Sequence, residues 1–247
     1  MKTLTYFISD THLGARHESA SEARCREKRL CRWLEEIEPT AKRLYMLGDI
    51  LDFWWEYRTV VPRGHVRFFG ALARLADSGT EITWLRGNHD IWLKDYLEAE
   101  IPARVVTGAL QEEIDGTWFF LEHGDGVGRR SFGKRLLRGF FHNPLAQKVY
   151  SAIHPRWGVA LAQGWSKSSR QRGTAATVAS PGVVALTEFA REYSSQHPEI
   201  KHFLFGHVHC PLSLTLETGA DVTILGTWLD EPNCAVFDGK KIEKYVV

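Results

Sequence analysis

Short strand-like runs that end in a glycine or a polar residue are the feature of this sequence that most constrains its fold. The clearest is the run at residues 44–47, Leu-Tyr-Met-Leu, which stops at Gly48 and Asp49. In an open α/β sheet, the loops at the carboxyl ends of parallel strands are where ligands bind. Asp49 alone is more simply explained as a helix cap or turn residue, for which Asp is favoured. Four other runs end in the same way, however, and this repetition favours a functional role.

The five strand ends together offer seven side chains that could bind a metal ion. They comprise two carboxylates, one amide and four imidazoles: Asp10, His12, Asp49, Asn88, His123, His207 and His209. Such a set of oxygen and nitrogen donors, without a thiolate, suits manganese, iron, zinc or nickel better than calcium or a structural zinc. One ion that keeps positions open for water and substrate does not need seven ligands. The count therefore favours two divalent ions that share a carboxylate, as in enzymes that displace phosphoryl groups.

The pattern between the strand ends indicates an α/β fold. Apolar periodicity predicts three helices, at residues 18–38, 66–76 and 183–194. Strands are expected at residues 4–8, 44–47, 81–85, 104–107, 109–114, 117–121, 202–205, 212–216, 222–225, 234–237 and 242–247. The β-α-β-α-β order of the first 85 residues indicates a parallel sheet with crossover helices. We therefore expect two facing sheets with helices outside, in a single domain over residues 1–247.

Composition limits the class of protein. Of the 247 residues, 44% are hydrophobic and 25% are charged, which is ordinary for a water-soluble globular domain. No apolar run approaches the roughly 18 residues needed to span a bilayer, and the first residues do not resemble a signal peptide. The four cysteines form no CxxC pair, so we expect reduced thiols. These features predict a cytoplasmic protein that is not inserted into a membrane.

The ordered motifs resemble the calcineurin-like metallophosphoesterase superfamily. The series is Asp10-x-His12, Gly48-Asp49-x-x-Asp52, Gly87-Asn88-His89-Asp90, His123 and Gly206-His207-x-His209. The resemblance implies a four-layer α/β/β/α sandwich of two mixed sheets and a dinuclear phosphohydrolase. One ion would be bound by Asp10, His12, Asp49 and His209, and the other by Asp49, Asn88, His123 and His207.

The same resemblance implies roles beside the ions. His89 and Asn88 would be the catalytic residues, with His89 protonating the leaving group or neutralising phosphate charge. Asp52 would orient a ligand through a hydrogen bond rather than bind an ion itself. A water activated by the metal ions would attack phosphorus.

Three segments are similar to the UDP-2,3-diacylglucosamine hydrolases of lipid A biosynthesis. They are residues 7–14, residues 47–54 and Glu122-His123-Gly124-Asp125, followed by an inserted segment. The similarity implies cleavage of a pyrophosphate in a lipid-nucleotide substrate, which yields UMP and 2,3-diacylglucosamine 1-phosphate, usually with Mn²⁺. One departure is His89, where the best-known branch of that family carries arginine.

The inserted segment, residues 126–180, is basic and apolar. Residues 126–173 contain ten Lys or Arg and no Asp or Glu, interleaved with aromatic and aliphatic residues. This pattern predicts short amphipathic helices that form a lid over an amphiphilic substrate, or that lie peripherally on an anionic membrane at the cytoplasmic face of the inner membrane. The alternative is a packed helical insertion with a solvated basic face. Candidate substrate contacts are Trp54, Arg86, Ser166, Lys167 and Arg170, although Trp54 could equally pack in the core.

Two other functions compete with this interpretation. A phosphodiesterase or nuclease of the same superfamily could use the basic insertion to hold a nucleic-acid backbone. The apolar content of the insertion argues against that, so nucleic acid is not an expected partner. A non-catalytic scaffold would normally have lost metal ligands, and here none of the seven is missing.

Overall fold

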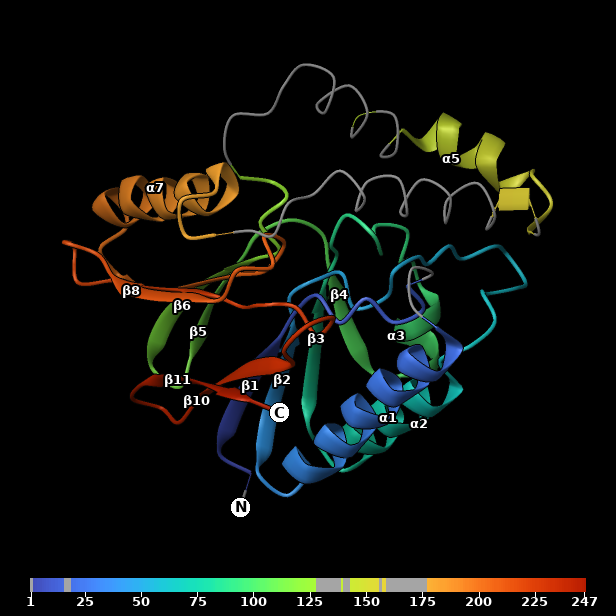
Figure 1. Ribbon diagram of the computed structural model, residues 1–247, viewed down its shortest axis with the longest axis horizontal. Helices are drawn as coiled ribbons and strands as arrows, with labels where there is room; N and C mark the ends of the chain where they lie inside the picture. Colours follow the sequence, from blue (N-terminus) through green and yellow to red (C-terminus); the bar gives the residue numbers. More distant parts are fainter. Residues whose placement is uncertain (1, 16–18, 128–138, 140–142, 156, 159–176) are drawn as a thin grey trace.

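The protein consists of two β-sheets packed face to face, with helices on both outer faces (Figure 1). The structure is a computed structural model that describes residues 2–15, 19–127, 139, 143–155, 157–158 and 177–247. Both sheets are mixed, with a parallel centre and an antiparallel edge.

The first sheet has six strands in the order β11-β10-β1-β2-β3-β4. Its strands are β1 (Leu4–Ile8), β2 (Ala41–Met46), β3 (Glu81–Leu85), β4 (Ala103–Val106), β10 (Asn233–Phe237) and β11 (Ile242–Val246). Strands β1 to β4 are parallel, whereas β10 runs antiparallel to both β1 and β11. The carboxyl ends of β1, β2 and β3 therefore meet at one edge of this sheet.

The second sheet has five strands in the order β5-β6-β7-β9-β8. Its strands are β5 (Leu110–Ile114), β6 (Thr117–Glu122), β7 (Ile200–Phe205), β8 (Leu212–Thr215) and β9 (Asp221–Ile224). Strands β6, β7 and β9 are parallel to one another. The ends of β6 and β7 thus form a second row of loops.

Helices cover the outer face of each sheet (Figure 1). Helices α1 (Ala20–Ile37), α2 (Val66–Asp77) and α3 (Tyr96–Glu100) lie on the six-stranded sheet, and α7 (Pro181–Gln196) lies on the five-stranded one. Helix α1 begins with a capping box between Ser19 and Glu22. Its buried residues Leu30, Trp33, Leu34 and Ile37 follow the 3.6-residue period and face the sheet.

The core between the sheets joins them into one sandwich. Phe7 of β1 stacks on Tyr45 of β2 and on Phe119 of β6, at ring-centroid distances of 5.3 and 5.8 Å. All three rings are buried. With the helices outside, these contacts complete the four-layer α/β/β/α arrangement that the motif series predicted.

Most predicted elements are present with shifted ends, and β1 and β3 have the predicted bounds. Helix α3 was not predicted. Part of the insertion forms α5 (Pro144–Ser151), which lies outside the two sheets (Figure 1). Ser166, Lys167, Arg170 and most of the predicted lid lie outside the described residues, so the lid stays a prediction. None of the four cysteines is in a disulfide, and no described helix is long and apolar enough to cross a membrane.

The core between the sheets makes a testable prediction. Phe119→Ala removes a fully buried ring from this core and should lower the free energy of unfolding by about 3–5 kcal/mol. Trp118→Ala is the matched control on the same strand, because Trp118 faces outward and is 39% exposed. Its cost should be about 1 kcal/mol or less. Urea denaturation measures both, and equal losses would contradict the assignment of this core.

Candidate metal centre

The loops that follow β1, β2, β3, β6 and β7 bring all five predicted strand ends to one place. Three groups of donor atoms form there among the described residues, and within each group the atoms lie within 4.8 Å of one another; two consist of predicted ligands, and the third is His12, Asp52 and His89. The first group contains Asp10, His12 and His209, and the second contains Asp49, His123 and His207. The first group therefore combines the loops after β1 and β7, and the second combines the loop after β2 with those after β6 and β7, so each group draws on both sheets.

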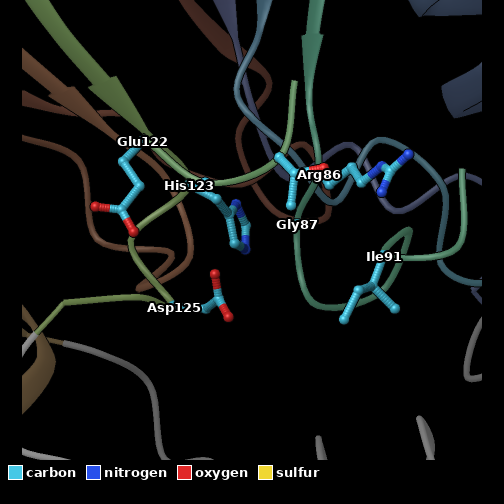
Figure 2. Close-up of a pocket in the computed structure, with 8 residues that line it drawn as sticks. Arg86, Gly87, Ile91, Glu122, His123 and Asp125 are labelled. Atoms are coloured by element: carbon cyan, nitrogen blue, oxygen red, sulfur yellow. The ribbon is translucent and has the colours of Figure 1, made fainter. Parts of the chain in front are cut away.

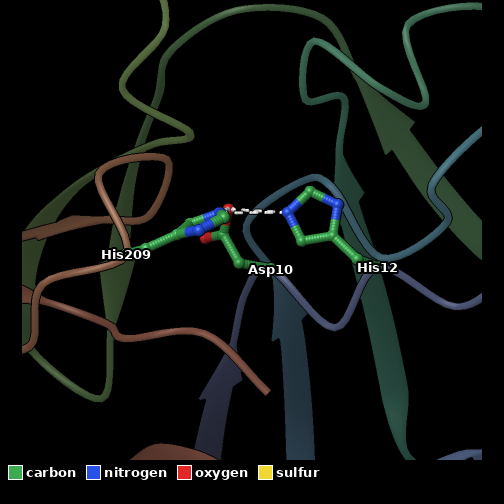
Figure 3. Close-up of side chains that lie close together, drawn as sticks. All are labelled: Asp10, His12 and His209. Atoms are coloured by element: carbon green, nitrogen blue, oxygen red, sulfur yellow. Dashed lines mark hydrogen bonds and ion pairs between the residues drawn. The ribbon is translucent and has the colours of Figure 1, made fainter. Parts of the chain in front are cut away.

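The side chains of the first group point toward one another (Figure 3). His209 Nε2 lies 3.1 Å from Asp10 Oδ1 and 3.0 Å from His12 Nε2, and His12 Nε2 lies 3.7 Å from Asp10 Oδ1. With metal–ligand bonds of about 2.0–2.2 Å, neighbouring ligands on one ion are roughly 3–3.5 Å apart. The spacing of this group fits a small divalent cation.

Asp49 connects the two groups. Its Oδ2 lies 3.2 Å from His123 Nε2 and 3.9 Å from His12 Nε2, so one carboxylate oxygen faces an imidazole of each group. Asn88 joins the second group, with Oδ1 3.3 Å from His123 Nε2. The structure thus brings together all seven residues that the sequence predicted as ligands.

The backbone at the centre is strained. Seven non-glycine residues of the described chain have positive φ, and five of them are predicted ligands: Asp10 (52°), His12 (43°), Asp49 (53°), His207 (69°) and His209 (53°). Positive φ is uncommon outside glycine and concentrates at functional sites. Hydrogen bonds between the first two loops hold this conformation, from Asp10 N to Gly48 O (3.1 Å) and from His12 N to Asp49 O (3.0 Å).

Two glycines allow these loops to approach closely. A Cβ on Gly87 would overlap Asp49 Oδ1, and a Cβ on Gly48 would lie 2.7 Å from the Gly87 backbone and 2.8 Å from His123 Nδ1. Gly48 also has a φ of 85°, which side-chain-bearing residues rarely adopt. Neither position has room for a side chain.

Neighbouring groups orient the imidazoles. His123 Nδ1 donates to the carbonyl of Leu47 (2.8 Å), which leaves Nε2 free to bind a cation. Asp52 Oδ1 lies 3.4 Å from His12 Nδ1 and 3.5 Å from His89 Nδ1. Asp52 therefore lies beside the Nδ1 atoms of two imidazoles of the site. This position suits the orienting role that was predicted for it.

Asp90 belongs to the motif series, but no role was predicted for it from the sequence. Its carboxylate is fully buried and accepts hydrogen bonds from five N–H groups: Gly87 N (2.7 Å), Ile50 N (2.9 Å), Asp49 N (3.2 Å), Trp84 Nε1 (3.3 Å) and Leu51 N (3.4 Å). Successive backbone N–H groups that converge in this way form an anion-binding nest, and here the anion belongs to the protein. Asp90 thereby fixes the loop of Asp49 against the loop of Asn88 and His89.

The charges at the centre compensate one another. Burial alone would raise the pKa of Asp10 and Asp49, but His12 and His209 lower that of Asp10, and His123 and His89 lower that of Asp49. Burial alone would lower the pKa of His123, yet Asp49 raises it well above the usual value. Buried carboxylates of this kind need a cationic partner. Protonated imidazoles can supply this positive charge, and so can divalent metal ions. The burial of the carboxylates and the mixed oxygen and nitrogen donors fit divalent metal ions.

The predicted substrate contacts that the structure describes do not face the centre. A hollow beside His123 is lined by Arg86, Gly87, Ile91, Thr107, Gly108, Glu122, His123 and Asp125. The guanidinium of Arg86 points away from His123 (Figure 2). Burial lowers the pKa of Arg86, and the carboxylates of Glu56, Asp90 and Glu98 partly offset that shift. Trp54 is fully buried and its indole donates to Glu56 (2.9 Å), which favours the packing alternative.

A family model described as calcineurin-like phosphoesterase matches residues 4–211, which include every residue of the centre. The chain belongs to the calcineurin-like phosphoesterase family. Enzymes of this fold depend on divalent metal ions, so the protein is a metal-dependent phosphohydrolase, as the motif series predicted.

Several curated relatives of this calcineurin-like phosphoesterase share one name. A UDP-2,3-diacylglucosamine hydrolase of Porphyromonas gingivalis is 41% identical and aligns with 97% of this chain and 95% of its own length. Proteins of that name from Ralstonia nicotianae and Stenotrophomonas maltophilia are each 26% identical over 90% and 92% of this chain, and 83% and 92% of their own lengths. Among solved structures, a dimetal phosphatase from Danio rerio aligns with 98% of this chain and 95% of its own, with a TM-score of 0.47 and 16% identity.

The position of Asp49 between the two groups predicts the metal content of two variants. Asp49→Ala should lose both ions, because it removes the oxygen that both groups share. His12→Ala should chiefly weaken one, because its Nε2 belongs to the first group. Elemental analysis of the purified variants measures the number of ions per chain. Loss of a single ion in each variant would show that Asp49 is not a bridge.

The hydrogen bonds of Asp90 predict a loss that acts through its neighbours. Asp90→Asn places an amide against N–H donors, so the loop of Asp49 should shift and metal affinity should fall by roughly tenfold or more. Glu56→Gln is the control, because Glu56 is also buried and accepts from Lys94 N (2.7 Å), Asp95 N (3.1 Å) and Tyr96 N (3.3 Å). It should lower stability without changing metal affinity, as titration calorimetry with Mn²⁺ can test. Equal metal affinities in the two variants would contradict this role.

Proposed function

We propose that this phosphohydrolase cleaves the pyrophosphate of UDP-2,3-diacylglucosamine and releases UMP and 2,3-diacylglucosamine 1-phosphate. The observation that carries the proposal is the 41% identity to a UDP-2,3-diacylglucosamine hydrolase over nearly the full length of both chains. The convergence of the seven candidate ligands supports a hydrolytic centre in this chain as well.

We propose two divalent ions, with Mn²⁺ as the metal. Asp10, His12, Asp49 and His209 would hold one ion, and Asp49, Asn88, His123 and His207 the other. When bound, such ions supply Lewis acidity, which lowers the pKa of water and offsets charge on phosphoryl oxygens. The protein contributes the fixed positions of the ligands, since the loops and the nest of Asp90 set them before substrate binds.

His89 is the proposed catalytic group beside the ions. Its Nδ1 lies 3.0 Å from the carbonyl oxygen of Asp52, and its backbone N–H donates to Asp49 Oδ1 (2.7 Å). A ring whose Nδ1–H donates to this carbonyl keeps Nε2 for the substrate, and in the protonated imidazolium form Nε2–H can donate its proton to the leaving phosphate or hydrogen-bond a phosphoryl oxygen. Burial lowers the pKa of His89, and the charge of Asp49 opposes that shift only in part.

The basic insertion is the proposed contact with lipid. The described helix α5 has an outer surface in which Leu145 is 70% and Val149 is 62% exposed, with Lys148 between them. Apolar residues beside cations suit an amphiphilic anion or the surface of an anionic membrane. We propose that the enzyme acts at the cytoplasmic face of the inner membrane, in peripheral contact with it, and that Ser166, Lys167 and Arg170 help to bind the substrate.

The assay that tests this function uses UDP-2,3-diacylglucosamine in detergent micelles with Mn²⁺ and follows release of UMP. His89→Ala should lower kcat by on the order of 10²–10⁴, with metal content retained. His197→Ala is the control, because His197 lies at the exposed end of α7, away from the centre. Rapid hydrolysis of nucleic acid with none of the lipid nucleotide would favour the nuclease alternative. Inertness of the fully metallated protein toward every phosphoester would favour the scaffold.

A further inference from the structure

The connection between β9 and β10 crosses from the five-stranded sheet to the six-stranded sheet beside the metal centre. It consists of residues 225–232, and none of them belongs to the motif series. Strand β10 runs antiparallel to β1, with Ala235 opposite Phe7, so the amino end of β10 lies at the carboxyl end of β1. Strand β9 is parallel to β7 and ends in the same row of loops. This connection is therefore a sixth strand end beside the five that carry the candidate ligands.

Two donors of this connection bind the backbone carbonyl of Asp10. Thr227 Oγ1 donates to Asp10 O (3.0 Å), and Trp228 N donates to the same oxygen (3.1 Å). Thr227 is only 4% exposed, so water does not compete for these hydrogen bonds. On the other side of the residue, Asp10 N donates to Gly48 O. The peptide units before and after Asp10 are thus both fixed, which keeps its φ at 52°.

Hydrogen bonds and ring packing within the connection hold its own shape. Gly226 N donates to Asn233 Oδ1 (3.0 Å), and Trp228 Nε1 donates to Asn233 O (2.9 Å). A Cβ on Gly226 would overlap Asn233 Nδ2, so the two ends of the connection are in close contact. The Trp228 ring lies 5.8 Å from the ring of Trp33 on α1, and both are buried. The donors that face Asp10 therefore have fixed positions.

The backbone of Asp10 decides where its carboxylate points. Oδ2 accepts from Ser9 Oγ (2.6 Å) and His207 N (2.9 Å), so this oxygen is held by its neighbours. Oδ1 is the oxygen that lies 3.1 Å from His209 Nε2, in the first group of donors. Because the side chain turns with the backbone at Cα, a rotation of the peptide unit after Asp10 would move Oδ1 away from the other donors.

We propose that Thr227 is a positioning residue for Asp10, and thereby for the ion of the first group. Its hydroxyl accepts from Leu229 N (3.2 Å), which directs the hydroxyl hydrogen to Asp10 O. Within the described chain, neither hydrogen bond of this hydroxyl reaches the second group. Thr227 thus acts through Asp10, as the outer partners of metal ligands do. The proposal rests on the two ions of the proposed function and is independent of the lipid substrate.

The test is a calorimetric titration of the metal-free full-length protein with Mn²⁺. Thr227→Val keeps the shape of the side chain and removes the hydroxyl, so the affinity for the first-group ion should fall by roughly tenfold, with the other ion bound as in the wild type. Thr227→Ser restores the donor and should stay within about threefold of the wild type. Thr5→Val is the control, because Thr5 is buried in β1 and its hydroxyl has no hydrogen-bond partner in the described part of the chain.

A second titration assigns the effect to one group of donors. In a His12→Ala background, where the first-group ion is already weakened, Thr227→Val should cause no further loss for the remaining ion. Thr227→Ala repeats both titrations with a smaller side chain if Thr227→Val does not fold. Equal losses for both ions, an affinity like that of the wild type in Thr227→Val, or an equal loss in Thr227→Ser would overturn the proposal.

The wild-type titration separates this proposal from the proposed function. Wild-type protein that binds a single ion would contradict the proposed pair, whereas a loss for that ion in Thr227→Val but not in Thr5→Val would still support the role of Thr227. Wild-type protein that binds no ion would overturn both. A protein that binds both ions and leaves the lipid nucleotide intact would contradict the proposed substrate, and the titrations of Thr227→Val would still decide the role of Thr227.

Discussion

The carboxylate of Asp49 is the point on which the rest of the site depends. One of its oxygens faces His12, from the six-stranded sheet, and His123, from the five-stranded sheet. That position exists only where the ends of the two sheets meet. The core of Phe7, Tyr45 and Phe119 holds the sheets together at that point. The assembly of each group of donors is therefore a property of sheet packing, not of any single loop.

Backbone strain and the burial of charge destabilise the centre, and hydrogen bonds to the backbone and neighbouring opposite charges offset both. Five candidate ligands have left-handed backbone, which costs on the order of 1–3 kcal/mol each when nothing compensates. The carboxylate of Asp90 accepts hydrogen bonds from backbone N–H groups of the Asp49 loop and of the Gly87 loop. It thus stabilises a backbone conformation that the local sequence disfavours. Asp10 and Asp49 are buried among imidazoles, so their charge is compensated before any substrate arrives.

The candidate site could be predicted from the sequence better than its surroundings. The ligands follow strands whose apolar runs are short and clear, and β1 and β3 have the predicted bounds. Helix α3 was missed because it has five residues, and its first turn is held by Glu56, which lies 40 residues earlier. For the same reason Trp54 and Arg86 were predicted as substrate contacts although they do not face the centre, and no role was predicted for Asp90. Their roles depend on contacts across the fold, and those contacts have no periodic pattern in the sequence.

The loops after β2 and β3 serve two purposes that lie a few residues apart. Asp49, Asp52, Asn88 and His89 lie at the metal centre, whereas Trp55 and Trp92 support α5. If the candidate ligands hold the metal ions, a change in them should lower hydrolysis of every phosphoester. A change in the aromatic residues would alter only what lies beside the centre. Such a division lets one metal site serve different substrates, because the residues that position a substrate can change while the strained, fully packed ligand loops stay as they are.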